Sequence, residues 1–242
     1  NAAEDDWLDL IGLCRLLTET PEEEFVAAVE TSIDVDNWLR FFAINTFFDN
    51  RESSLSNGIG DDFILFKDLS SNRHMLMAYD LDTILGRGDT PGSPTAGLFK
   101  ATEPAQASGH LTKPDQVARF LKHPAFVPHY FAELQRQAET VFTANQTSAL
   151  VEQIIGGLTN ETEIDRLNQF VAERREFILS QIPHKLTFAS SLPVKQGHLV
   201  SAIAQIALEG RADAIATRSI TINGAAANWS PWEAKWNATA FE

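Results

Sequence analysis

The chain has 242 residues, of which 44% are hydrophobic, and this is enough for one sizeable core or for a domain with a small appendage. Its 33 acidic and 19 basic side chains give a formal charge of -14, which argues against a nucleic-acid backbone or an anionic membrane surface as the main partner. No apolar run approaches the roughly 20 residues of a membrane-spanning helix, so we expect no membrane span.

The first 48 residues carry helical signals. Apolar residues recur with helical spacing over 7–17, and the following Thr-Pro-Glu-Glu over 20–23 is typical of a helix start. The single cysteine, Cys14, lies in the first apolar run, so we expect a buried core thiol and no intramolecular disulfide. Asp36 is expected to cap a third helix, which runs to about Phe48, is apolar on nearly all sides and therefore belongs in the core.

A β-hairpin is predicted next. A polar, glycine-containing loop over 49–62 precedes two short β-like runs, 63–66 and 74–79. Asp62 stands just before the first run and Asp80 just after the second. Antiparallel pairing would bring these two acids to the same open end of the hairpin, although they are far apart in the sequence.

The rest of the chain divides into a loop, a helical part and a β-rich part. Residues 86–114 are rich in Gly, Pro, Ser and Thr and predict a long ordered loop or a cover. Periodicity then predicts helices at about 115–122, 124–142, 146–157 and 160–182.

The composition changes after Ser190, where alternating and β-branched runs are separated by turn signals. We therefore predict an α+β fold that is predominantly α-helical. It would consist of a helical domain over 1–189 and a β-rich appendage over 190–242. The appendage is expected to begin a second module, because two or three strands alone seldom make a stable sheet.

The acids at the open end of the predicted hairpin suit a hard divalent cation such as Mg²⁺, which takes carboxylate, phosphate and water oxygens as ligands. The candidates are Asp62, Asp80 and Asp82. If the chain stays extended, Asp80 and Asp82 face the same way while Leu81 points into the core; if it turns, only one of them need touch the metal. The alternative is that these acids are ordinary solvated turn formers. Spacing alone does not decide between the two interpretations.

Several segments resemble the CotH (spore coat protein H) kinase family. Its members show an Asn-rich helix end followed by an Asp, an Asn or Asp before an aromatic strand, and a Trp-Asp-x-Asp-like motif ending in Phe-Gly. The specific blocks here are 43–52, 60–66 with Gly-Asp-Asp-Phe-Ile-Leu-Phe, and 77–86 with Met-Ala-Tyr-Asp-Leu-Asp-Thr-Ile-Leu-Gly. Segments similar to the family's helical half and to the β segment that often follows it are 120–126, 170–178 and 208–236.

The resemblance implies an atypical, protein-kinase-like phosphotransferase that moves a phosphoryl group from Mg-ATP to Ser or Thr of a secreted or coat protein. Its implied cofactors are ATP with Mg²⁺ or Mn²⁺, and Ca²⁺ is a further candidate. By motif, Asp80 would take the metal-binding role after the hairpin, Asp62 the role of the metal-binding Asn before it, and Asp82 would complete the coordination. The implied partners are a nucleotide, a protein substrate and further modules of a longer chain.

The catalytic-loop position is less well defined by the resemblance. Glu52 falls where the family usually has its catalytic Asp, but it is one methylene longer, and Asp49, Asn50 and Asn57 are rival assignments. No Gly-rich phosphate loop and no strand-borne Lys paired with a helical Glu precede residue 43. We therefore expect the nucleotide-covering small lobe to be absent from this chain. Either the chain, which starts at Asn1, is the helical large lobe of a longer protein, or the molecule binds metal without completing a kinase site.

The family also implies a bacterial spore-coat or exported protein, and hence an extracellular or cell-envelope location. The rival interpretation from another class is a catalytically silent, exported binding or structural module in which the same acids hold a structural cation such as Ca²⁺. A metal-dependent hydrolase is a third alternative, which would need histidines or more convergent acids than the chain offers.

Overall fold

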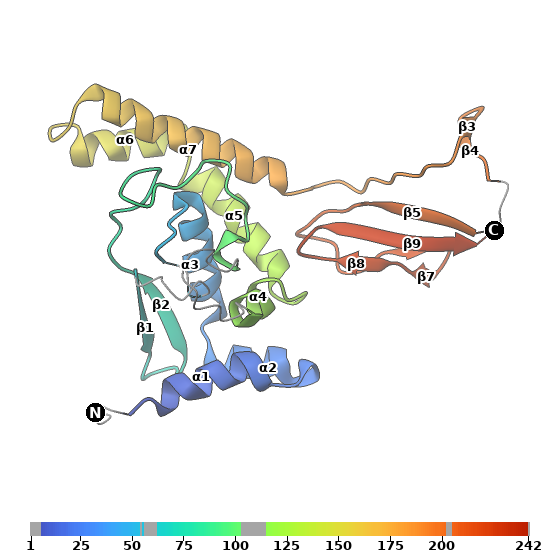
Figure 1. Cartoon of the computed structure of the whole chain (residues 1–242), viewed down its shortest axis with the longest axis horizontal. Helices are drawn as coiled ribbons and strands as arrows, with labels where there is room; N and C mark the ends of the chain where they lie inside the picture. The colour runs from blue at the N-terminus through green and yellow to red at the C-terminus, as the bar shows by residue number, and fades with distance from the viewer. Residues whose placement is uncertain (1–5, 54, 56–61, 103–114, 202–204, 242) are drawn as a thin grey trace. The chain divides into compact units, whose positions relative to one another are not determined.

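The computed structural model describes residues 6–53, 55, 62–102, 115–201 and 205–241 (Figure 1). The chain forms two compact units. The first unit comprises Asn1–Leu121 and Glu133–Gln181, and the second comprises Lys122–Ala132 and Ile182–Glu242. Helices dominate the described part of the first unit, and short antiparallel strands the described part of the second. The prediction of a predominantly helical α+β fold is confirmed, while the domain boundary near residue 190 stays a prediction.

The first unit begins with three helices, α1 (Leu8–Glu19), α2 (Glu22–Ser32) and α3 (Val35–Phe48). The cap of α3 is Asp34, whose carboxylate accepts a hydrogen bond from the Asn37 amide at 2.9 Å, so the expectation that Asp36 caps this helix is wrong. Helix α3 is a core helix, as predicted. Its buried residues are Trp38, Leu39, Phe41, Phe42, Ala43, Asn45, Thr46 and Phe47.

Helix α1 buries only Leu13 and Leu17 among its residues, and Cys14 is exposed. The expectation of a buried core thiol is therefore wrong. Trp7 and Leu8 are exposed as well, at 61% and 73% of their surface. In a run that is apolar at most positions, composition does not identify the side of the helix that meets the core.

The predicted hairpin is present as β1 (Phe63–Lys67) and β2 (His74–Ala78), paired antiparallel. Its turn is closed by Asp68, whose carboxylate accepts hydrogen bonds from the hydroxyls and backbone amides of Ser71 and Ser70. These bonds hold the pKa of Asp68 well below its usual range. The carboxylate therefore stays charged, and keeps these hydrogen bonds, when the pH falls well into the acid range.

Helix α3 anchors the hairpin through β2. The Trp38 indole donates to the His74 carbonyl at 3.0 Å. The Asn37 side chain donates to the Leu76 carbonyl at 3.1 Å and accepts from the Leu76 amide at 2.7 Å. Because one Asn side chain satisfies both backbone groups of a strand residue, β2 is held in register against α3. This register places the open end of the hairpin.

The remaining elements of the helical part follow in the predicted order. They are the 3₁₀ turn η1 (Lys100–Thr102), α4 (Asp115–Leu121), α5 (Val127–Thr140), α6 (Ala144–Ile155) and α7 (Glu161–Gln181). The four helices predicted between residues 115 and 182 are thereby confirmed. Within the described ranges, no helix is both long and apolar enough to cross a membrane.

Arg174, on α7, is fully buried and donates hydrogen bonds to three backbone carbonyls. Its guanidinium reaches the Thr46 carbonyl at 2.8 and 2.6 Å, the Pro94 carbonyl at 3.2 Å and the Ala96 carbonyl at 2.5 Å. One side chain therefore joins α7, the last turn of α3 and the segment around residue 95. The loop that follows α3 starts from this fixed point.

The second unit contains a three-stranded antiparallel sheet in the order β5-β9-β8. The strands are β5 (Gln205–Arg211), β9 (Lys235–Phe241) and β8 (Asn228–Ser230). Two further pairs have two residues per strand: β3 (Val194–Lys195) with β4 (His198–Leu199), and β6 (Thr221–Ile222) with β7 (Ala225–Ala226).

Gly210 provides a stability test for the second unit. A Cβ at this position would lie 2.0 Å from the Thr187 carbonyl oxygen, because the chain at 187–189 runs beside β5. We expect Gly210→Ala to lower the free energy of unfolding by about 1–3 kcal/mol, since the backbone must shift to make room. Thermal unfolding would measure this change. Gly12→Ala is the matched control, because nothing lies within 4 Å of its Cβ and alanine favours the helix; equal losses in both variants would contradict the prediction.

Candidate active site

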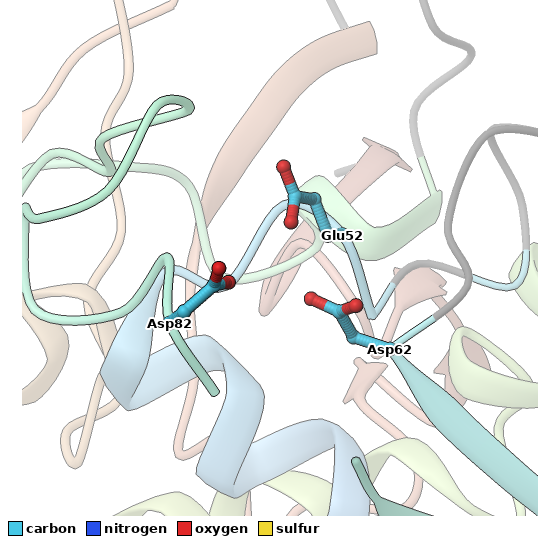
Figure 2. A group of neighbouring side chains, drawn as sticks. All are labelled: Glu52, Asp62 and Asp82. Carbon is cyan, nitrogen blue, oxygen red and sulfur yellow. The ribbon is translucent and has the colours of Figure 1, made fainter. Parts of the chain in front are cut away.

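Three carboxylates from three separate segments converge in the first unit (Figure 2). Glu52 comes from the loop after α3, Asp62 directly precedes β1, and Asp82 follows β2. Their ligand oxygens all lie within 4.8 Å of one another. Asp62 is buried, Glu52 is half-buried and Asp82 is exposed, so the cluster has one side open to solvent.

The backbone places Asp62 at the open end of the hairpin. The Tyr79 amide donates to the Asp62 carbonyl at 3.2 Å, which continues the pairing one step beyond β1. The Asp62 amide donates to the Glu52 carbonyl at 3.1 Å. The loop residue and the strand-end residue are thus tied directly to each other, although neither belongs to a regular element.

The Glu52 carboxylate is oriented by two hydroxyl donors from the loop after the hairpin. Thr90 donates to one oxygen at 2.8 Å and Thr83 donates to the other at 3.2 Å. The Glu52 amide donates to the Asn50 side-chain oxygen at 2.9 Å, which shapes the turn before it. Hydrogen bonds to both oxygens fix the position of this carboxylate in the cluster. Its remaining lone pairs can still accept a further hydrogen bond or bind a cation.

Asp49, the other candidate for the catalytic loop, lies outside the three-acid group. It ends α3 in the left-handed conformation with φ at 44°. Its carboxylate accepts a hydrogen bond from the Ser93 amide at 2.7 Å and lies 3.9 Å from the Arg51 guanidinium. A Cβ on Gly92 would lie 2.6 Å from the Asp49 carbonyl oxygen, so the loop packs closely here. Asp49 therefore anchors the segment around residue 93.

Asp80 also lies outside the three-acid group. It is exposed, and its φ of 47° shows that the chain turns here instead of staying extended. A non-glycine residue in the left-handed region carries strain, and such strain gathers at functional sites. Because of the turn, Leu81 is 40% exposed and does not enter the core. Of the rival loop positions, Asn50 is buried, and Asn57 lies outside the described residues.

The electrostatics of the cluster favour a cation. Two unit charges about 4 Å apart repel by roughly 1 kcal/mol in water and about 4 kcal/mol at an effective dielectric constant near 20. Three carboxylates that converge around the buried Asp62 share this cost whenever they are charged together, and a bound cation would offset it. The donor set consists of oxygens alone and therefore fits Mg²⁺, Mn²⁺ or Ca²⁺ better than softer metals.

A comparison with protein-family models identifies the family of this chain. The family model described as CotH kinase protein matches residues 1–178, which is well over half of the chain. The chain belongs to the CotH kinase family. Among curated proteins, none matches this chain. The CotH match includes all three converging acids and nearly all of α7, and the β-rich segments after residue 182 lie beyond it.

The spacing of the hairpin predicted Asp62 and Asp82, together with Asp80, as metal ligands, and the CotH resemblance added Glu52. Neither predicted the two threonines that hold Glu52. Thr83 and Thr90 lie in a segment rich in small polar residues, where no local pattern distinguishes a donor to Glu52 from a solvated threonine. Their sequence separations from Glu52 are 31 and 38 positions. Only the folding of the loop back over the hairpin end brings them together.

Proposed function

We propose that this CotH family member is a metal-dependent phosphotransferase that moves the γ-phosphoryl group of Mg-ATP to a Ser or Thr hydroxyl of a secreted or coat protein. The observation that carries the proposal is the convergence of Glu52, Asp62 and Asp82 within 4.8 Å. A solvent-open group of oxygen donors can hold a cation and leave coordination positions for phosphate oxygens. The family's spore-coat name supports a coat or extracellular location.

The proposed division of roles follows burial and position. Asp62, which precedes β1, and Asp82, which follows β2, would hold the cation at the open end of the hairpin, and Asp80 in the turn after β2 would complete its shell. Glu52 would orient the acceptor hydroxyl and take up its proton, because its carboxylate already accepts two hydroxyl hydrogen bonds. The bound cation would supply charge neutralisation for the phosphates.

The experiment that tests this function is calorimetry of the full-length protein with ATP and Mg²⁺. We expect saturable heat that disappears when EDTA replaces Mg²⁺. Asp80→Ala should weaken this binding if Asp80 completes the cation shell. Asp89→Ala is the matched control, because Asp89 is an exposed acid of the same loop that lies outside the three-acid group.

Two results would change the assignment. Unchanged metal-dependent nucleotide binding in Asp80→Ala would remove Asp80 from the site. Heat with Ca²⁺ but none beyond dilution with Mg-ATP would overturn the phosphotransferase and favour an exported module with a structural cation.

A further inference from the structure

The Thr90 hydroxyl occupies the place where the proposed base would hold a substrate. It donates to the Glu52 carboxylate at 2.8 Å, inside the range of about 2.6–3.2 Å that a general base needs to take a proton. We infer that Thr90 is an intramolecular phosphoryl acceptor, so that the protein modifies its own loop. This inference rests on the proposed function and names a first substrate for the same site.

Neighbouring threonines show why Thr90 is the acceptor. Thr83 donates to the other oxygen of Glu52 at 3.2 Å, but it is only 1% exposed and a phosphate cannot approach it. Thr95 is exposed, but its hydroxyl pairs with the Ser93 hydroxyl at 3.1 Å and not with Glu52. Thr90 combines contact with Glu52 and partial exposure.

The loop that carries Thr90 is anchored on both sides. Arg87 forms an ion pair with Glu163 of α7, and the Ser93 amide donates to Asp49 at 2.7 Å. A hydroxyl fixed at both flanks loses little further conformational freedom when it reacts, which favours an intramolecular step. The anchors therefore present Thr90 to the three-acid group as a positioned acceptor.

The chemical step balances with ATP as the only co-reactant. The Thr90 Oγ1 forms a bond to the γ-phosphorus, the bond from that phosphorus to the oxygen bridging the β- and γ-phosphates breaks, and ADP leaves. The hydroxyl proton passes to the Glu52 carboxylate. Glu52 then releases the proton to solvent. The product phosphothreonine carries about -1.5 to -2 charges near pH 7 and is repelled by the ionised Glu52 and by Asp82.

The test incubates the full-length protein with Mg-ATP and locates phosphate by tandem mass spectrometry of its peptides. We expect phosphate on Thr90 at a rate independent of protein concentration, complete loss of that phosphate in Thr90→Val, and its retention at the same position in Thr90→Ser. Thr95→Val is the matched control and should keep the wild-type phosphate. Thermal unfolding of each variant shows whether the fold is kept, and Thr90→Ser keeps the test valid if Thr90→Val does not fold.

The outcomes separate this inference from the proposed function. Phosphate transfer to an added Ser/Thr peptide mixture with Thr90 left unmodified would overturn the inference and keep the phosphotransferase. A rate proportional to protein concentration would show transfer between molecules and would also overturn it. Failure to bind Mg-ATP in calorimetry would remove the proposed function and the inference together.

Discussion

Replacing Asp62 by alanine is expected to weaken Mg²⁺-dependent nucleotide binding by about 100-fold or more. Removing a residue that only hydrogen-bonds to a metal ligand typically lowers the affinity for the metal by about 10–100-fold. Removing the ligand itself should lower it by at least as much. Asp62 is the buried member of the three-acid group and is fixed by the Glu52 carbonyl on one side and the Tyr79 amide on the other. Calorimetry with Mg-ATP, and the rise in unfolding temperature that Mg²⁺ produces, would both measure the loss.

A conservative variant and the metal-free protein provide the controls. Asp62→Asn keeps one oxygen donor and the side-chain shape, so we expect an intermediate loss of affinity. In the metal-free protein, Asp62→Ala removes one of three converging negative charges, and the unfolding temperature should not fall sharply. A large fall in that temperature, together with wild-type binding of Mg-ATP, would show that Asp62 serves the fold and not the cation.

The second large effect is expected at Arg174. Arg174→Met keeps a long side chain but leaves the carbonyls of Thr46, Pro94 and Ala96 without this donor. Unsatisfied buried acceptors cost about 1–3 kcal/mol each, and three carbonyls lose this donor together. We therefore expect the free energy of unfolding to fall by about 3–5 kcal/mol, measured by urea denaturation.

The neighbouring arginine is a matched control for this prediction. Arg175 is half-buried on the same helix and donates to one carbonyl, that of Ala138, at 2.7 Å. Arg175→Met should cost only about 1 kcal/mol, the net worth of one hydrogen bond. Similar losses at both positions would mean that Arg174 does not hold the segments together as its contacts indicate. The loss of stability in Arg174→Lys should lie between the losses in these two variants, because an ammonium group cannot reproduce the forked hydrogen bonds of the guanidinium.

The regular elements could be predicted because their signals are local. The helical spacing before residue 48 and after residue 115, and the short apolar runs at 63–66 and 74–79, depend on neighbours within a few positions. The same signals did not show which side of α1 is buried, so the expectation for Cys14 was wrong. They also did not distinguish Asp34 from Asp36 as the cap of α3, because both are acids at the same helix start.

For the candidate site, too, the sequence predicted what depends on strand pairing and did not predict what depends on the path of the chain between elements. Position in the sequence predicted that Asp62 would lie at the open end of the hairpin, because antiparallel pairing requires it. The left-handed turn at Asp80, and the grouping of Asp82 rather than Asp80 with Glu52 and Asp62, depend on how the chain leaves β2.

The sequence by itself determined the helical core, the hairpin and the presence of acids at its open end, since periodicity and strand pairing follow from neighbouring residues. Only the tertiary structure decided which acids meet and what holds them. Glu52 joins Asp62 and Asp82 because the loop after α3 is tied to the hairpin end. Thr90 reaches Glu52 because its loop is pinned by contacts with residues tens of positions away. Such contacts have no local signal, because they form only when separate segments fold against one another.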